Sequence, residues 1–64
     1  MSQQQDVVFH LTNVGPLTPL EALRLYGIMR LGAIIHDLRR AGYNIQTTII
    51  RNKKKFWASY SLEK

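Results

Sequence analysis

An α+β fold is predicted by the order of structural signals along this chain of 64 residues. Two capping-box patterns, which begin at Ser2 and Thr18, each mark the start of a helix. A third apolar stripe with helical spacing follows the second of these segments. The end of the chain alternates polar residues with β-branched and aromatic ones on both sides of a basic turn, which is typical of a β-hairpin. We therefore expect three helices and a C-terminal hairpin in a single domain that spans residues 1–64.

The first helix is expected at residues 3–12. Ser2 and Gln5 can cap each other's backbone N–H groups, and Asp6 lies early enough to suit the positive end of the helix dipole. His10 falls outside the apolar stripe and is expected at the surface. The apolar face is formed by Val7, Val8, Leu11 and Val14.

The second helix has the clearest start in the chain. Thr18 is followed by a proline at the first helical position and by Glu21 three residues later, which completes the capping box. Pro16 cannot continue the first helix, and Leu17 stands alone before the cap, where it can form a very short strand. Gly27 is expected to end the second helix. The inward residues are expected to be Leu20, Ala22, Leu23 and Tyr26.

The third helix is expected at residues 30–41, with Gly42 as its stop. Its buried stripe consists of Leu31, Ile35 and Leu38. Arg39 is expected to be a solvated residue at the helix end. With about 100° between successive residues, the opposite face holds Met29, Ala33, His36 and Arg40.

The predicted hairpin surrounds the basic segment 51–55. Its inward side chains must stay on one face, which leaves two registers. Ile45 pairs with Tyr60 around a two-residue turn at Asn52-Lys53, or with Leu62 around a four-residue loop. The inward sets are Tyr43, Ile45, Thr47 and Ile49 on the first strand and Phe56, Ala58, Tyr60 and Leu62 on the second.

The order helix, short strand, helix, turn, helix, hairpin is the plan of a winged helix-turn-helix, in which the hairpin is the wing. The chain also carries a set of motifs between residues 7 and 62: Gly15-Pro16-Leu17-Thr18-Pro19-Leu20-Glu21-Ala22-Leu23, Tyr26-Gly27, Arg30-Leu31, Ile35, Asp37-Leu38-Arg39, Gly42-Tyr43-Asn44-Ile45 and Tyr60-Ser61-Leu62. Through these motifs it resembles the small winged helix-turn-helix proteins that are encoded mainly by bacteriophages and prophages. The resemblance implies DNA binding.

Ile34 departs from the pattern of this family, whose members often carry arginine at that position. If such an arginine contacts phosphate, that contact is lost or relocated in this chain. Alternatively, Ile34 is an exposed apolar residue that serves a protein partner.

The charge of the chain is strongly and unevenly basic. Nine Lys and Arg residues against four Asp and Glu give a net charge of +5 and a pI near 10.1. Seven of the nine cations lie between Arg30 and Lys55, and none lies in the first 23 residues. One basic face of this kind is the electrostatic footprint of a nucleic-acid-binding domain.

The residues expected to contact DNA lie on the third helix and at the tip of the wing. They are Arg30, Ala33, Ile34, His36 and Arg40 on the helix, and Arg51, Lys53, Lys54 and Lys55 on the wing. Arg30 and Arg40 are candidates for phosphate or guanine contacts, and His36 for a base edge or a phosphate. Ala33 is small enough either to approach a base closely or to pack against the second helix. The wing cations are expected to follow the phosphate backbone or to enter the minor groove.

Several classes of protein are not expected. An enzyme is not expected, because the chain shows no paired carboxylates, no nucleophilic triad and no Gly-rich phosphate loop. Without cysteine and with two histidines, the chain should hold no metal and no cofactor. Because it lacks an apolar run of about 20 residues and a signal-peptide pattern, no membrane contact is expected, and we place it in the cytoplasm of a bacterial host.

The leading hypothesis is sequence-preferring binding of double-stranded DNA, with residues 30–41 in the major groove and the basic wing 51–55 on the backbone. The role would be that of a phage transcriptional regulator or an excisionase-like recombination factor, as a homodimer or a cooperative assembly on DNA. The alternative is a winged-helix module that binds and inhibits a host protein through Ile34 and Trp57, which the strand alternation places on the outward face. RNA binding is a weaker hypothesis, because the signature of a single-strand reader is missing.

Overall fold

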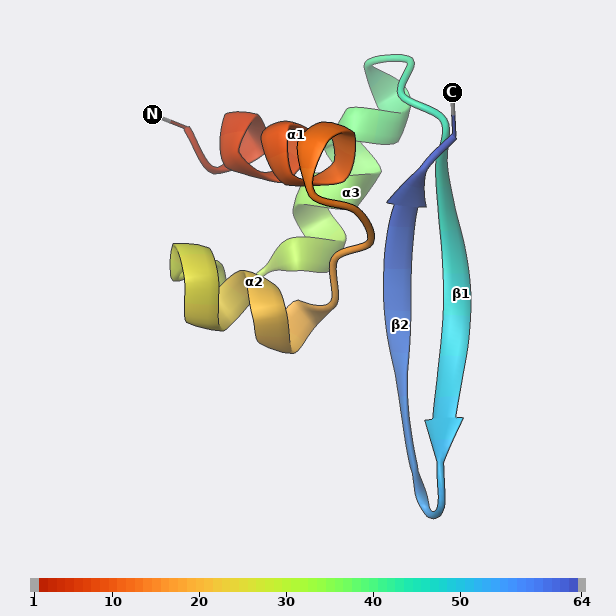
Figure 1. Ribbon diagram of the computed structural model, residues 1–64. Coiled ribbons are helices and arrows are strands. Elements are labelled where there is room, and N and C mark those ends of the chain that lie inside the picture. Colours follow the sequence, from red (N-terminus) through yellow and green to blue (C-terminus); the bar gives the residue numbers. More distant parts are fainter. Residues whose placement is uncertain (1, 64) are drawn as a thin grey trace.

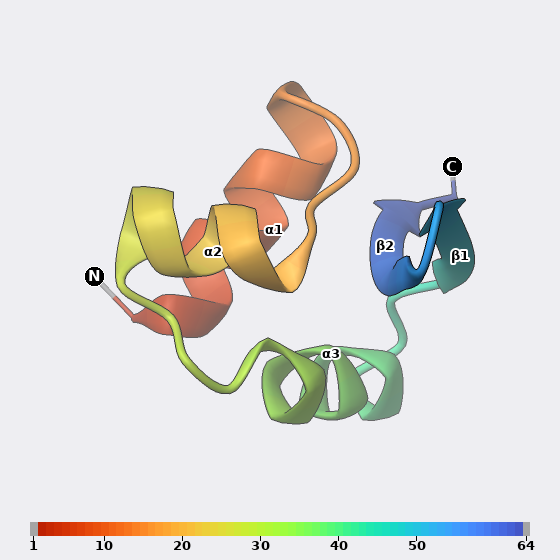
Figure 2. The same ribbon diagram turned by 90° about the horizontal axis from the view of Figure 1, so that it is seen from below.

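The computed structural model describes residues 2–63 and confirms an α+β fold of three helices and a two-stranded antiparallel sheet. The elements follow in the order α1 (Gln3–Asn13), α2 (Pro19–Tyr26), α3 (Leu31–Arg40), β1 (Ile45–Asn52) and β2 (Lys55–Leu62). In Figure 1 the helices gather on one side of the hairpin, whose tip projects beyond them. Figure 2 shows that α1 and α2 lie together, with α3 on the other side of the helical layer.

Both predicted capping boxes are present. The Gln5 N–H donates to Ser2 Oγ at 3.1 Å, and the Ser2 N–H donates to Gln5 Oε1 at 3.3 Å. In α2 the Glu21 N–H donates to Thr18 Oγ1 at 3.2 Å, and the Thr18 N–H donates to Glu21 Oε1 at 3.3 Å. Gly27, with a φ of 67°, ends α2 in the left-handed region that glycine adopts without steric cost. The observed caps therefore confirm the predicted starts of both helices and the predicted end of α2.

The hairpin adopts one of the two predicted registers, with Ile45 opposite Leu62. The prediction of a four-residue loop for this register is wrong, because Asn52 still pairs with Lys55 and the turn contains Lys53 and Lys54 alone. Side chains alternate between the two faces of a strand, so burial of one face restricts the register. This alternation does not determine how far the strands stay paired toward the tip.

Leu17 makes a single β-bridge to β2 where a very short strand was expected. The Leu17 N–H donates to the Tyr60 carbonyl at 2.8 Å, and the Tyr60 N–H donates back to the Leu17 carbonyl at 2.9 Å. The Leu17 side chain is fully buried. One residue of the linker between α1 and α2 thus joins the free edge of β2 to the centre of the core.

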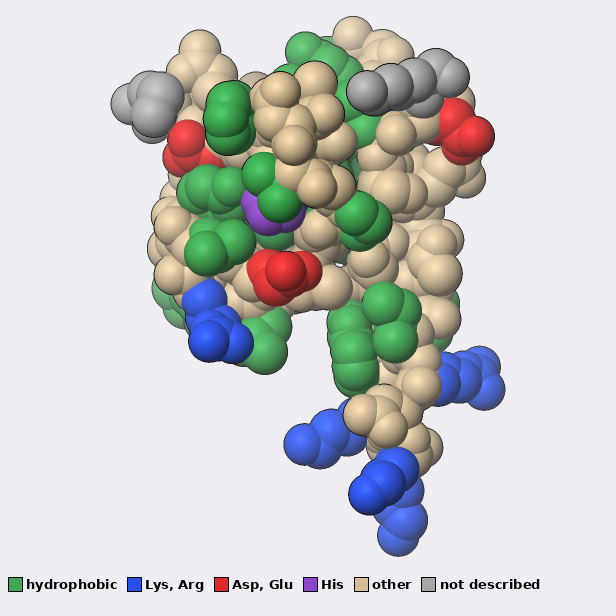
Figure 3. All heavy atoms as spheres, viewed as in Figure 1, with side chains coloured by type: hydrophobic (Ala, Val, Ile, Leu, Met, Phe, Trp, Pro, Cys, Tyr) green, Lys and Arg blue, Asp and Glu red, His purple; other side chains and the backbone are tan. Residues whose placement is uncertain are grey.

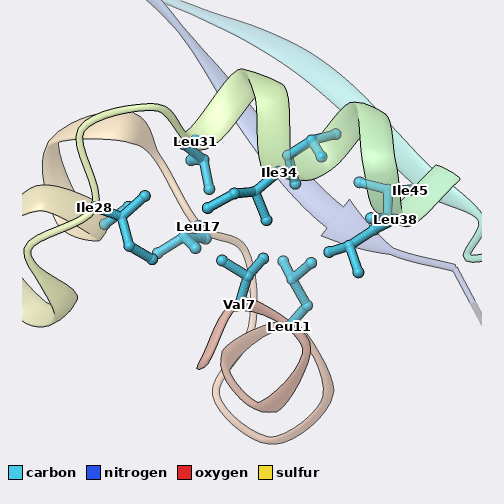
Figure 4. Packing of buried hydrophobic residues seen from close by; sticks show 10 residues of the cluster. Val7, Leu11, Leu17, Ile28, Leu31, Ile34, Leu38 and Ile45 are labelled. Atoms are coloured by element: carbon cyan, nitrogen blue, oxygen red, sulfur yellow. The ribbon is translucent and has the colours of Figure 1, made fainter. Parts of the chain in front are cut away.

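The core draws residues from all three helices, from the linkers and from the start of β1 (Figure 4). The predicted stripe of α3 is buried as expected. The full set consists of Val7, Leu11, Leu17, Ala22, Ile28, Leu31, Ile34, Ile35, Leu38 and Ile45.

In the helical part of the chain, three residues predicted to face inward are exposed instead. Leu20 and Leu23 are 62% and 46% exposed, and Val14 is exposed beyond the last turn of α1. α2 has only 8 residues, and its buried side is formed by Ala22 with partly buried Tyr26. The physical reason is that a helix this short presents a narrow strip to the core, so its leucines face solvent.

The prediction that His10 lies at the surface is wrong, because only 2% of it is exposed. Its ring lies edge-on to Tyr26, with His10 Nδ1 2.8 Å from the Tyr26 hydroxyl and His10 Nε2 3.3 Å from the Pro16 carbonyl oxygen. A carbonyl oxygen can only accept, so Nε2 carries the proton and Nδ1 accepts from the tyrosine. His10 lies three residues after Val7 and therefore shares its face, which the choice of Val8 for the stripe obscured.

The face of the hairpin that carries Ile45 is covered at its base and open toward its tip. Ile45 is buried, and Tyr60 and Leu62 pack against the core as predicted. Toward the tip the same face becomes exposed: Thr47, Ile49 and Phe56 were predicted to face inward, but all three are exposed. Thr47 is reached only by the Arg39 side chain from α3, and Ile49 and Phe56 lie past the part of the hairpin that packs on the core. Tyr43, also expected inside, is 40% exposed before β1 begins.

We predict that Tyr26→Phe lowers the free energy of unfolding by about 1–3 kcal/mol, because it leaves buried His10 Nδ1 without a hydrogen-bond donor. Urea unfolding, followed by far-UV circular dichroism, measures the change. Tyr43→Phe is the matched control, since it removes a hydroxyl from an exposed tyrosine. Equal losses in the two variants would contradict a structural role for the His10–Tyr26 pair.

Candidate nucleic-acid interface

The outer face of α3 is open to solvent along its length. Leu31, Ile34, Ile35 and Leu38 bury the inner face. The residues on the other side are exposed, and α3 occupies an outer position in Figure 2. The exposed set consists of Arg30, Gly32, Ala33, His36, Asp37 and Arg40, with Met29 just before the helix. Ala33 therefore does not pack against α2, and four of the five helix residues expected to contact DNA share one accessible surface.

Ile34 is the exception. Its side chain is 8% exposed and belongs to the core (Figure 4), so the expectation of an exposed apolar residue is wrong. Ile34 lies three residues after Leu31 and four before Leu38, which places it on the buried face. Ile34 is thus a packing residue, available neither to DNA nor to a protein partner.

The start of α3 differs from the starts of the other helices. Arg30 stands at the N-cap, is exposed, and makes no side-chain cap. The N–H groups of the first turn of α3 therefore receive no side-chain acceptor there, whereas α1 and α2 carry full capping boxes. A free helix N-terminus with an arginine beside it favours an anionic group.

Arg39 is a structural residue that the sequence did not reveal. Its Nε and Nη2 donate to the Ile45 carbonyl at 3.0 and 2.8 Å, and Nη2 also donates to Thr47 Oγ1 at 2.7 Å. Arg39 is exposed, as expected for the end of the helix, but its guanidinium also fastens the end of α3 to the start of β1, which was not expected. No local pattern signals this contact, because the acceptor is a backbone carbonyl whose direction depends on the turn at Gly42.

The tip of the wing concentrates the positive charge. Arg51, Lys53, Lys54 and Lys55 are all exposed, and Figure 3 shows basic side chains spreading from the end of the hairpin. Lys53 has a φ of 57°, in the left-handed region where glycine or asparagine is far more common in hairpin turns. The turn thus holds a lysine where a residue with less steric strain would be favoured for folding alone.

Trp57 lies on the other side of the wing from Phe56, as strand alternation predicted. It is 37% exposed and lines a cleft between the wing and the start of α2, together with Pro19 and Leu20. Glu21 and Lys55 complete the rim of this cleft. Trp57 is therefore partly covered by the protein itself.

An exposed helix with arginines toward both ends, packed beside a hairpin with a basic tip, is the arrangement that defines a winged helix-turn-helix domain. The chain belongs to the winged helix-turn-helix domain family, whose model matches residues 2–64. Domains of this class are typically DNA-binding modules without enzymatic activity. No curated protein and no solved structure shows a significant match to the chain.

Two other kinds of site are not found in the part of the chain that the structure describes. None of its helices has the length and apolar character that a membrane crossing requires. Within residues 2–63, no three His, Asp or Glu side chains come together in a way that could hold a metal ion.

We predict that Arg39→Ala lowers the free energy of unfolding by about 1 kcal/mol, because hydrogen bonds between α3 and β1 are lost. Arg40→Ala removes the neighbouring exposed arginine and should change this free energy by less than about 0.5 kcal/mol. Urea unfolding of the two variants without DNA provides the comparison. A common unfolding midpoint would show that Arg39 does not stabilise the base of the wing.

Proposed function

We propose that this chain binds double-stranded DNA with sequence preference, with α3 in the major groove and the tip of the wing on the adjacent backbone. The observation that carries the proposal is the contrast between the two faces of α3. One face is buried in the core, and the opposite face is exposed to solvent from Arg30 to Arg40. The basic hairpin beside it supplies a second contact.

The dimensions and side chains of α3 suit a major groove. A groove about 12 Å wide admits a helix whose diameter with side chains is about 10–12 Å. Gly32 and Ala33 have little bulk, so the backbone of α3 can come close to base edges. Arg30 is placed to donate to guanine O6 and N7 or to a phosphate, and His36 can donate to either kind of group.

The wing supports binding that is independent of sequence. Its four exposed cations lie between residues 51 and 55, and the strands that carry them contain no carboxylate. Each phosphate that such a tip neutralises releases condensed counterions, which strengthens binding at low salt. The strained backbone of Lys53 adds weight to this proposal, because a turn under no demand for charge would favour glycine there.

The biological role that we propose is that of a phage transcriptional regulator or an excisionase-like recombination factor. Both need a small basic module that assembles on DNA. Selection of bound duplexes from a random pool distinguishes them. An enriched inverted repeat would indicate a dimeric regulator, and tandem direct repeats a cooperative assembly.

A second candidate function is binding to a host protein. The observation that favours it is the exposure of Leu20, Leu23 and Leu25 on α2, of which Leu20 lines the cleft beside Trp57. Exposed apolar patches often mark protein contacts. Absence of any enriched duplex in the same selection would favour this function over DNA recognition.

We predict that replacing Lys53, Lys54 and Lys55 together with alanine weakens binding to every duplex. The slope of log K against log salt concentration should flatten by up to about 0.9 for each lysine that contacts a phosphate. Fluorescence anisotropy over a salt series measures both effects. The matched control carries three arginines at these positions, which keeps the charge and should keep the slope. Unchanged affinity and slope in the alanine variant would remove the wing from the interface.

We predict that Arg30→Ala loses more affinity for a selected duplex than for random DNA, by roughly 1–3 kcal/mol if the guanidinium pairs with a guanine. Parallel titrations of the two duplexes at one salt concentration provide the measurement. Equal losses on both duplexes would make Arg30 a backbone contact, and no loss on either would exclude it from the interface.

A further inference from the structure

Phe56 is the most exposed aromatic side chain among residues 2–63, with 74% of it open to solvent. It lies next to the turn of the wing, where its cross-strand partner is Arg51. Ile49, the next large apolar residue on the same face, is 53% exposed. The apolar area of the Phe56 ring stays in contact with water and does not stabilise the fold. Its exposure therefore needs an explanation.

The alternation of the strands shows which way this face is turned. Trp57 points to the opposite face, which closes toward α2. Phe56 shares its face with Ile45 and Tyr60, which pack on the core at the base of the hairpin. The Phe56 face therefore meets the core at the base of the hairpin, but toward the tip it is open to solvent, while the Trp57 face lies beside the start of α2.

Every charged residue around Phe56 is basic. A shallow hollow at the tip is lined by Ile49, Arg51, Lys53, Lys54, Lys55 and Phe56. Between residues 45 and 62 there is no Asp or Glu. An apolar ring framed by cations is complementary to a polyanion that also offers apolar surface, and stacked bases between two phosphate backbones have both properties.

We propose that Phe56 is a wedge that enters the minor groove of duplex DNA and kinks it at one base step. The proposal rests on the DNA binding proposed above, with α3 in the neighbouring major groove. Two strands about 4.8 Å apart, together with their side chains, are too wide for a minor groove of about 6 Å. Only side chains at the tip can enter, and among them Phe56 alone is a large apolar residue on the open face.

Two consequences follow from a wedge at this position. The duplex bends away from the inserted ring, by an angle in the range of roughly 20–90° that such wedges produce. The site also acquires a preference for a flexible pyrimidine–purine step under Phe56, because those steps unstack most easily. This preference would arise without any hydrogen bond between the wing and a base.

The test compares Phe56→Ala with the wild-type chain on a short duplex that carries fluorescent donor and acceptor dyes at its ends. Wild-type protein should raise energy transfer, because bending brings the ends together. Phe56→Ala should still bind, about tenfold more weakly, and should leave the transfer near the value of free DNA. Phe56→Leu keeps an apolar wedge and should retain most of the bend. Leu25→Ala removes a comparably exposed apolar side chain from α2 and should leave the bend unchanged.

The outcomes separate the wedge from DNA binding itself. If wild-type protein binds without bending, or if Phe56→Ala bends DNA as well as the wild type does, the wedge is excluded and DNA binding stands. If bending falls equally in Phe56→Ala and Leu25→Ala, the effect is not specific to Phe56 and the wedge is likewise excluded. If wild-type protein binds no duplex, the DNA-binding proposal fails and the wedge fails with it.

Discussion

The attachment of the hairpin to the helices depends on the segment Pro16-Leu17. The Pro16 carbonyl accepts from His10, which in turn accepts from the Tyr26 hydroxyl, so the segment is held by both α1 and α2. Leu17 then pairs with Tyr60 through two backbone hydrogen bonds and buries its side chain completely. A buried imidazole that lost either partner would be costly, and this makes the three groups act as one joint.

This joint and Arg39 together attach the wing to the helices. Leu17 holds the free edge of β2, and Arg39 holds the start of β1 from the end of α3. The hairpin is therefore fixed on both strands at its base and extends freely toward its tip. A lone hairpin is marginal in water, so the register at the tip relies on continued pairing from this fixed base. The contacts of Leu17 and Arg39 also determine the position of the wing relative to the exposed face of α3.

Features that are determined by residues close together in the sequence could be predicted, and features that depend on contacts between distant segments could not. Caps and glycine stops act within a few residues, and the starts of α1 and α2 were therefore predicted correctly. The choice of buried residues failed at His10 and Ile34, whose spacing puts them on the buried faces of α1 and α3 although neither was included in the predicted stripes. It also failed at Leu20, which is 62% exposed because the short α2 presents only a narrow strip to the core. The exposed face of α3 was predicted because its buried stripe is strongly periodic. Arg39 could not be assigned, since its acceptor is a backbone group placed by a turn.

Three features that oppose folding lie together at the tip of the wing. Lys53 has a left-handed backbone, Phe56 is exposed, and Arg51 lies among three lysines of like charge. None of these is compensated by the core, which ends near Ile45 and Tyr60. A bound polyanion would reduce the repulsion between the cations, and an apolar contact would cover the ring, so binding would relieve what folding leaves unfavourable. These unfavourable features of the unbound wing support the proposed contact between the hairpin and an anionic ligand.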